Sequence, residues 1–287
     1  MIPNSFKTYL TKHFNENITQ ISPIHGGDIS KAFKIDTATN SYFLKLNNRP
    51  DAKALFQAEA YGLNSIAHTN TIKTPEVLVC DRFHNTAFLL LEYINSKPSS
   101  GNDFKRLGTQ LAQLHGCTSD TFGLKLDNFI GCLPQSNKHY NDWASFYFNE
   151  RLLPQINLAK QKGLLKNAEC PNEKQIETRL KELLKAVRPS LLHGDLWSGN
   201  YLISEDGTPY LIDPAIYYGH HEVDIAMTKL FGGFDTSFYN SYHSYFPITP
   251  ESSDRLEIYL LYYLLVHLNL FGSSYHSAVT SILQKQF

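Results

Sequence analysis

Apolar and polar residues alternate in short runs over roughly the first ninety residues, a pattern typical of β-strands separated by turns. Between the third and fourth runs, residues 51–67 repeat apolar side chains at a helical period. This part of the chain is therefore predicted to be a five-stranded antiparallel sheet with one main helix. The strands are expected at residues 18–24, 31–35, 42–46, 76–81 and 87–94.

The pattern changes at the loop-rich segment 95–101, which we take as the boundary between two lobes, 1–94 and 95–287. Helical periodicity dominates the second lobe, so the chain as a whole is predicted to be α+β. A β-hairpin that joins 201–204 to 209–212 is expected to interrupt the helices. The helices are predicted at 103–115, 142–162, 173–188, 224–230 and 252–271.

Charge and hydropathy exclude two kinds of partner. The chain has 26 Lys and Arg against 27 Asp and Glu, a net charge of −1, which leaves no basic surplus for binding nucleic acid. The most apolar stretch, 258–270, is shorter than the roughly 18–20 residues of a bilayer span. His267 and Asn269 also interrupt it, so we expect a buried helix and no membrane association.

The cysteines indicate a reducing environment. None of the four forms a C-x-x-C pair, which argues against a zinc or thioredoxin-type site. They are too few to stabilise a chain of this length through disulfides, and the N-terminal segment shows no apolar export signal. We therefore expect reduced thiols and a cytoplasmic location. The cysteines are Cys80, Cys117, Cys132 and Cys170.

Several catalytic classes lack their motif in this chain. There is no Gly-Lys-Ser/Thr of a phosphate-binding Walker loop and no G-x-G-x-x-G of a dinucleotide-binding fold. His221 and Glu222 begin like the H-E-x-x-H of a zinc protease, but Ile225 stands where the second histidine must be. Ser198 lacks the first glycine of a G-x-S-x-G nucleophile elbow.

The segment 191–200, LLHGDLWSGN, carries the clearest chemical signal. Asp195 and Asn200 lie five residues apart in a loop, and the predicted hairpin then delivers Asp213 at the end of a strand. A D-x-x-x-x-N spacing followed by a strand-borne Asp is that of a kinase catalytic loop and its metal-binding carboxylate. Asn200 and Asp213 are therefore candidate Mg²⁺ ligands, because amide and carboxylate oxygens suit this hard cation.

The first lobe supplies matching parts for a nucleotide. Gly26 and Gly27 could form a loop that closes over phosphates, although a Gly-Gly pair is often only a turn. Lys45 is the only charged residue of the third predicted strand, and Glu59 on the following helix could hold it against the α- and β-phosphates. The alternative is that Lys45 and Glu59 are both exposed to solvent.

Two further sets of residues have candidate roles because of their position in the predicted elements. The backbone of Glu92, Tyr93 and Ile94, at the end of the fifth strand, is expected to hydrogen-bond adenine. Asp224 begins a helix, where it could be an N-terminal cap or could brace the backbone of the catalytic loop.

These segments resemble the fructosamine kinase, or ketosamine 3-kinase, family, within the broad group of kinase-like small-molecule phosphotransferases. The resemblance covers nearly the whole chain. It implies a bilobal protein-kinase-like fold and ATP- and Mg²⁺-dependent phosphorylation of the sugar 3-hydroxyl of ketosamines, in a deglycation repair role. The segments that carry it are 25–30, 43–45, 56–60, 127–131, 142–143, 192–200, 212–215, 218–220 and 231–234.

The resemblance also assigns the substrate side of the site. Asp195 is expected to accept or orient the proton of the attacking hydroxyl, and His193 and Trp197 are candidate substrate contacts. Trp197 could offer a flat face to the sugar or could simply pack under the loop. The expected partner is a small ketosamine or a glycated lysine, and the expected assembly is a monomer or weak homodimer.

Two other functions remain open at this stage. The acceptor could be another small hydroxyl compound, such as an aminoglycoside or choline. The chain could also be a non-catalytic pseudokinase, but the five residues of the kinase signature are all present, which argues against this. A regulated protein kinase is disfavoured, because no Arg precedes Asp195 and Pro-Ala, rather than Phe-Gly, follows Asp213.

Overall fold

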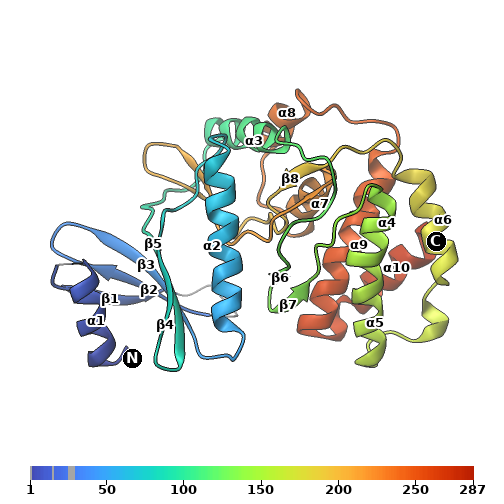
Figure 1. The fold of residues 1–287 in the computed structure, drawn as a ribbon. Helices are drawn as coiled ribbons and strands as arrows, with labels where there is room; N and C mark the ends of the chain where they lie inside the picture. The colour runs from blue at the N-terminus through green and yellow to red at the C-terminus, as the bar shows by residue number, and fades with distance from the viewer. Residues whose placement is uncertain (1, 15, 25–29) are drawn as a thin grey trace.

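The computed structural model describes residues 2–14, 16–24 and 30–287. The described chain forms two lobes, a sheet-rich one that contains the N-terminus and a mostly helical one that contains the C-terminus (Figure 1). The predicted loop Gly26-Gly27 lies outside the described residues.

The N-terminal lobe contains the predicted antiparallel sheet, with strand order β1-β2-β3-β5-β4. Its main helix, α2, lies between β3 and β4 in sequence, as predicted, but a second helix, α1, precedes the sheet and was not expected. The strands are β1 Gln20–Ile24, β2 Lys31–Asp36, β3 Ser41–Asn47, β4 Val77–Phe83 and β5 Thr86–Glu92, and the helices are α1 Asn4–Phe14 and α2 Ala52–His68.

The two helices explain why β5 is a continuous apolar run. Side chains on a strand point alternately to the two faces of a sheet. Phe88 and Leu90 join a core cluster with Phe6 and Leu10 of α1. Leu89 and its neighbours on the other face join a cluster with the buried side of α2. Figure 1 shows α1 and α2 on opposite sides of the sheet.

The described part of the C-terminal lobe is built mostly from helices, with three short antiparallel strand pairs between them. Its helices are α3 Gly101–His115, α4 Trp143–Tyr147, a π-helical turn at Phe148–Leu152, α5 Leu153–Gln161, α6 Glu173–Leu183, α7 Glu222–Leu230, α8 Thr236–His243, α9 Ser252–Phe271 and α10 His276–Gln286, with 3-10 turns at Asn167–Glu169 and Ser273–Tyr275. Its strands are β6 Asn128–Ile130, β7 Leu133–Gln135, β8 Ser190–Leu192, β9 Tyr201–Ile203, β10 Pro209–Leu211 and β11 Tyr217–Gly219.

Two predicted helices of this lobe differ from the structure. The expected helix 142–162 is interrupted by the π-helical turn, just before Pro154 at the start of α5. The expected helix 173–188 ends at Leu183, since Leu184 leaves helical geometry and Ala186 has a φ of 54°. The predicted hairpin is confirmed as β9 and β10, whereas α8, α10 and the β6–β7 hairpin were not predicted.

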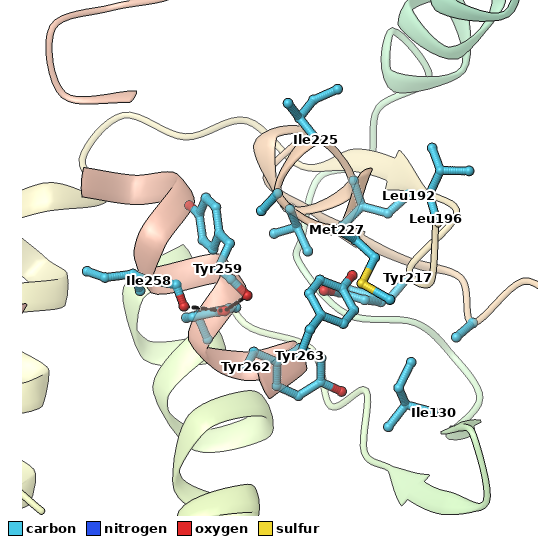
Figure 2. Close-up of a cluster of buried hydrophobic side chains, with 14 of the residues drawn as sticks. Ile130, Leu192, Leu196, Tyr217, Ile225, Met227, Ile258, Tyr259, Tyr262 and Tyr263 are labelled. Atoms are coloured by element: carbon cyan, nitrogen blue, oxygen red, sulfur yellow. Dashed lines mark hydrogen bonds between the residues drawn. The ribbon is translucent and has the colours of Figure 1, made fainter. Parts of the chain in front are cut away.

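The apolar stretch 258–270 is a buried helix, as predicted. It forms most of α9, whose residues Ile258, Tyr259, Tyr262 and Tyr263 pack into the core (Figure 2). In the part of the chain that the structure describes, no helix is long and apolar enough to cross a membrane. Leu192 and Leu196 belong to the same cluster, so the core around α9 packs against the loop that carries Asp195.

Candidate active site

The loop between β8 and β9 lies against the backbone that follows β10. The amide of Ala215 donates to the carbonyl of His193 at 2.9 Å. Gly194 adopts a φ of 83°, and a Cβ at this position would lie 2.1 Å from the carbonyl oxygen of Ala215. Only glycine allows both this conformation and this approach. The loop that carries Asp195 is therefore fixed next to the segment that carries Asp213.

Asp224 braces this loop, as one of the two predictions for it proposed. Its carboxylate accepts the backbone N–H of His193 at 2.7 Å and that of Gly194 at 2.9 Å. It also accepts a hydrogen bond from Nε2 of His115 at 3.0 Å. The Asp224 side chain is fully buried, and burial alone would raise its pKa. Its pKa is nevertheless lowered, because His115 and the donors of the loop stabilise the carboxylate.

His193, a predicted substrate contact, lies inside the protein, and a contact with substrate stays a prediction. Its side chain is fully buried, and its Nε2 donates to the carbonyl of Ile212 at 2.9 Å. Its Nδ1 then carries the lone pair and accepts from the backbone N–H of Asp195 at 3.3 Å. Both ring nitrogens are thus used inside the protein, so His193 positions Asp195 and the segment before Asp213.

Asp195 and Asn200 are linked to each other. Nδ2 of Asn200 donates to the carbonyl of Asp195 at 2.8 Å and to its carboxylate at 3.3 Å. The amide nitrogen is therefore committed to the loop, and Oδ1 of Asn200 is the atom that can bind a cation. Burial raises the pKa of Asp195 to about 7, and the nearby carboxylates of Asp213 and Asp224 add to the shift.

Lys45, Glu59 and Asp213 form a second cluster that joins the lobes. Nζ of Lys45 donates to Glu59 at 2.8 Å and also to Oδ1 of Asp213. The side chains of Lys45 and Glu59 are only 11% and 14% exposed, which rules out the alternative that both are solvent-exposed surface residues. The Asp213 side chain is 44% exposed and opens toward solvent.

The charges in this cluster stabilise one another. Burial would lower the pKa of Lys45, but Asp213 and Glu59 outweigh it and raise that pKa, so Lys45 stays a cation. Burial raises the pKa of Glu59 to about 7, against the opposing charge of Lys45. Asp213 is only partly buried, which would raise its pKa, yet its contact with Lys45 lowers that pKa, so Asp213 is a carboxylate at neutral pH.

Asp213 is held in an unusual backbone conformation. Its φ is 55°, in a region that residues other than glycine adopt rarely and that is often found at functional sites. The neighbouring residue Pro214 lies against Gly62 of α2, where a Cβ would come within 2.9 Å of its ring. Helix α2 therefore positions Glu59, which is the partner of Lys45, and Pro214, which follows Asp213.

The remaining predicted residues occupy the junction of the lobes and the surface of the loop. The backbone N–H of Glu92 donates to the carbonyl of Glu76 at 2.9 Å, and Ile94 is largely buried. Adenine binding at Glu92, Tyr93 and Ile94 stays a prediction. Trp197 is partly exposed and packs edge-on against Phe231, so both of its predicted roles remain possible.

Two residues that position the loop were not predicted from the sequence. His115 supports Asp224 from α3, and Tyr263 on α9 donates its hydroxyl to the carbonyl of Gly194 at 2.9 Å. A polar side chain among the apolar positions that a helix buries is the signal that could have identified both. Each is fully or almost fully buried.

The site combines a buried lysine–glutamate pair, a carboxylate beside it, and a loop carboxylate with an amide. Cation, carboxylates and amide in this arrangement can hold a nucleotide's phosphates and activate a hydroxyl. With the two-lobed fold, they define a kinase-like small-molecule phosphotransferase. The sequence model of the fructosamine kinase family matches residues 2–287, and the chain belongs to this family.

Curated relatives agree with this assignment. A protein of Lactiplantibacillus plantarum named "probable ketoamine kinase" is 41% identical over 281 residues, covering 97% of this chain and 98% of the relative. The chloroplastic protein-ribulosamine 3-kinase of Arabidopsis thaliana is 38% identical over 288 residues, with 96% and 84% covered. The chain is therefore a phosphotransferase that acts on a sugar hydroxyl.

Solved structures share the fold. A crystal structure assigned as a fructosamine-3-kinase from Haemophilus somnus superimposes with a TM-score of 0.88 at 30% identity, covering 98% of this chain and 96% of that one. An aminoglycoside phosphotransferase in complex with ADP and hygromycin B has a TM-score of 0.65 at 16% identity, with 98% of each chain covered. The second likeness concerns the fold alone and confirms the kinase-like architecture.

Proposed function

We propose that this protein uses ATP and Mg²⁺ to phosphorylate the 3-hydroxyl of the sugar in ketosamines. The phosphorylated adduct would then break down and release the amine, which is a deglycation repair role. The observation that carries the proposal is the joining of Lys45, Glu59 and Asp213 beside the loop that holds Asp195. Relatives named ketoamine kinase and protein-ribulosamine 3-kinase supply the substrate class.

The donor set fits a magnesium ion. Asp213 is an exposed carboxylate beside a cation, and Asn200 has only its oxygen left for a ligand. Two protein oxygens suit Mg²⁺, which usually completes its shell with water and substrate phosphates. When bound, the ion would neutralise charge on the phosphates. Lys45, held by Glu59, would orient the same phosphates from the N-terminal lobe.

Asp195 would act on the acceptor. Its carboxylate takes the proton of the 3-hydroxyl while that oxygen forms a bond to the γ-phosphorus, and the bond from the γ-phosphorus to the β–γ bridging oxygen breaks to release ADP. A pKa of about 7 suits a base that works near neutral pH. His193 and Asp224 keep Asp195 in place through the loop backbone.

A panel of acceptors tests the proposal. ATP consumption by the purified protein should depend on a ketosamine such as fructosyl-lysine or ribulosyl-lysine, and should stay at background with kanamycin or choline. The order of preference among ketosamines is a further result of the same panel. Consumption that depends on kanamycin or choline alone, or on no acceptor, would contradict the proposal.

A further inference from the structure

The β6–β7 hairpin contains most of segment 127–131, one of the segments that carry the family resemblance, and it lies beside α2 (Figure 1). Its side chains reach the backbone that follows Asp213. We propose that Asn128 in this hairpin is a positioning residue, which fixes that backbone so that the Asp213 carboxylate can hold Mg²⁺ on a bound nucleotide. The inference rests on the role proposed above for Asp213.

Two side chains of the hairpin hold the backbone that follows Asp213. Nδ2 of Asn128 donates to the carbonyl of Ile216 at 2.8 Å. Nε2 of Gln135 lies 3.5 Å from the carbonyl oxygen of Ala215, so the bond from Asn128 is the stronger of the two. Asp213 has a φ of 55°, a conformation that lasts only where the surrounding structure maintains it. Ile216 follows Asp213 by three residues, so the bond from Asn128 helps to maintain it.

The geometry of the hairpin fixes the orientation of the Asn128 amide. Asn128 and Gln135 are opposite each other in the two strands, which are joined by a tight turn in which Gly131 has a φ of 57°. Nε2 of Gln135 donates to Oδ1 of Asn128 at 2.8 Å, and Nδ2 of Asn137 donates to the same oxygen at 3.0 Å. Because these donors occupy both acceptor positions of Oδ1, Nδ2 of Asn128 must point toward Ile216.

A buried cation imposes the same direction from the other end. Arg151 is 0% exposed, and its guanidinium lies 3.9 Å from the ring centroid of Tyr217. One of its nitrogens donates to Oδ1 of Asn137 at 2.6 Å. Because a guanidinium can only donate, the oxygen of Asn137 must face Arg151 and the nitrogen must face Asn128. The hydrogen bonds therefore run in one direction, from Arg151 to the carbonyl of Ile216.

These polar side chains are costly to bury. We call four of them the hairpin network, and all are buried: Asn128, Gln135, Asn137 and Arg151. Removing a guanidinium and three amides from water carries a desolvation cost that apolar side chains of similar volume would avoid. A buried polar network specifies one geometry of the groups that it joins, which favours a positioning role over packing alone.

The experiment measures how much Mg²⁺ tightens nucleotide binding, a quantity that needs no turnover. Calorimetry gives the Kd of the full-length protein for AMP-PNP, an analogue of ATP that resists phosphoryl transfer, with Mg²⁺ and with EDTA. Asn128→Leu keeps a similar volume but lacks the donor to Ile216, and it should reduce the tightening about tenfold, or roughly 1.4 kcal/mol. Its Kd in EDTA should stay within about twofold of that of the unchanged protein, since Asp213 then holds no metal.

Gln135→Met is a second and milder variant. It removes one of the two donors to Oδ1 of Asn128 and nearly preserves the side-chain volume, so it should reduce the tightening about threefold. This variant tests the inference if Asn128→Leu does not fold.

Asn269→Leu is the matched control. Asn269 is buried on α9, and its Nδ2 donates to the carbonyl of Gln155 at 2.9 Å. The same substitution therefore removes the same kind of bond at a different place in the helical lobe. It should leave the tightening by Mg²⁺ within about twofold of that of the unchanged protein.

The inference is overturned if both hairpin variants keep the full tightening by Mg²⁺, or if Asn269→Leu reduces it as much as Asn128→Leu does. It is also overturned if both hairpin variants fail to fold or bind AMP-PNP equally poorly with Mg²⁺ and with EDTA, since the network would then serve stability alone. A wild-type protein whose affinity does not respond to Mg²⁺, or a response that survives in Asp213→Asn, would instead refute the proposed role of Asp213, and with it this inference.

Discussion

Asp195 is a case in which the needs of chemistry and of stability conflict. Its ordinary pKa is near 3.8, but burial and two neighbouring carboxylates raise it to about 7 in the folded protein. Between these two pH values, the folded protein therefore keeps a proton on Asp195 that the unfolded chain has already released. Compared with a neutral side chain at this position, Asp195 leaves the free energy of unfolding unchanged below about pH 4. It lowers that free energy as the pH rises through about 7.

Replacing this carboxylate should therefore stabilise the protein while removing its activity. In the absence of nucleotide and Mg²⁺, we expect Asp195→Asn to raise the free energy of unfolding by about 2 kcal/mol at about pH 8. The gain should shrink toward zero as the pH falls to about 4, because the native carboxyl is then neutral too. Denaturant unfolding of both proteins across this range measures the difference. A gain that is the same at every pH would contradict the shifted pKa of Asp195.

Among the helices and strands, α2 contacts both the Lys45 side and the Asp213 side of the candidate active site. It carries Glu59, which holds Lys45, and one turn later Gly62, which lies against Pro214. Because Pro214 directly follows Asp213, the spacing between α2 and the C-terminal lobe sets the position of a candidate metal ligand. The close approach requires glycine at residue 62.

A larger residue at this contact should disturb nucleotide use. Gly62→Val would place a branched side chain where a Cβ already lies 2.9 Å from Pro214, so α2 and the Asp213 segment must separate. We expect kcat/KM for ATP to fall about tenfold, because misplacement by a fraction of an ångström disrupts catalytic geometry. Steady-state kinetics at varied ATP concentration measure this effect.

Gly101→Val provides the comparison, since a Cβ at Gly101 has an ordinary contact of 3.5 Å with Ser237. This variant should keep its kinetics for ATP close to those of the unchanged protein. Wild-type kinetics in Gly62→Val would show that α2 does not position Asp213.

Across the whole molecule, the sequence predicted those features that depend on local pattern. The five strands and α2 follow from apolar periodicity, and Lys45, Asp195, Asn200 and Asp213 follow from spacing within a few residues of strand ends. Helices α8 and α10 were missed, because α8 is short and the few apolar residues of both are buried by packing against other helices, α3 in the case of α8 and α9 in the case of α10. Their burial depends on tertiary structure, which periodicity does not encode.

Contacts between distant segments also explain what the sequence left open at the site. Asp224 could be read as a cap or as a brace, and only its approach to the loop some thirty residues earlier decides between them. His193 looked available to substrate because it lies in the motif, whereas the carbonyl of Ile212 fixes its ring inside the protein. Burial and hydrogen-bond partners of this kind are properties of the folded chain.

The net charge of the whole molecule differs in its consequences from the charges at the candidate active site. A net charge of −1 provides no general attraction for a polyanion. The phosphates of ATP would instead meet one buried cation, Lys45, and a cation held by Asn200 and Asp213. We propose that these residues work across the junction of two lobes, 1–94 and 95–287.

The position of the transferred phosphate tests the central claim most directly. The protein should be incubated with ATP, Mg²⁺ and ribulosyl-lysine or fructosyl-lysine, and the product followed by two-dimensional ³¹P–¹H NMR before it decomposes. We expect a phosphorus resonance coupled to the proton on carbon 3 of the sugar, formed by the unchanged protein and absent with Asp195→Asn. Coupling to a different carbon's proton, or release of inorganic phosphate with no phosphorylated sugar, would contradict the account.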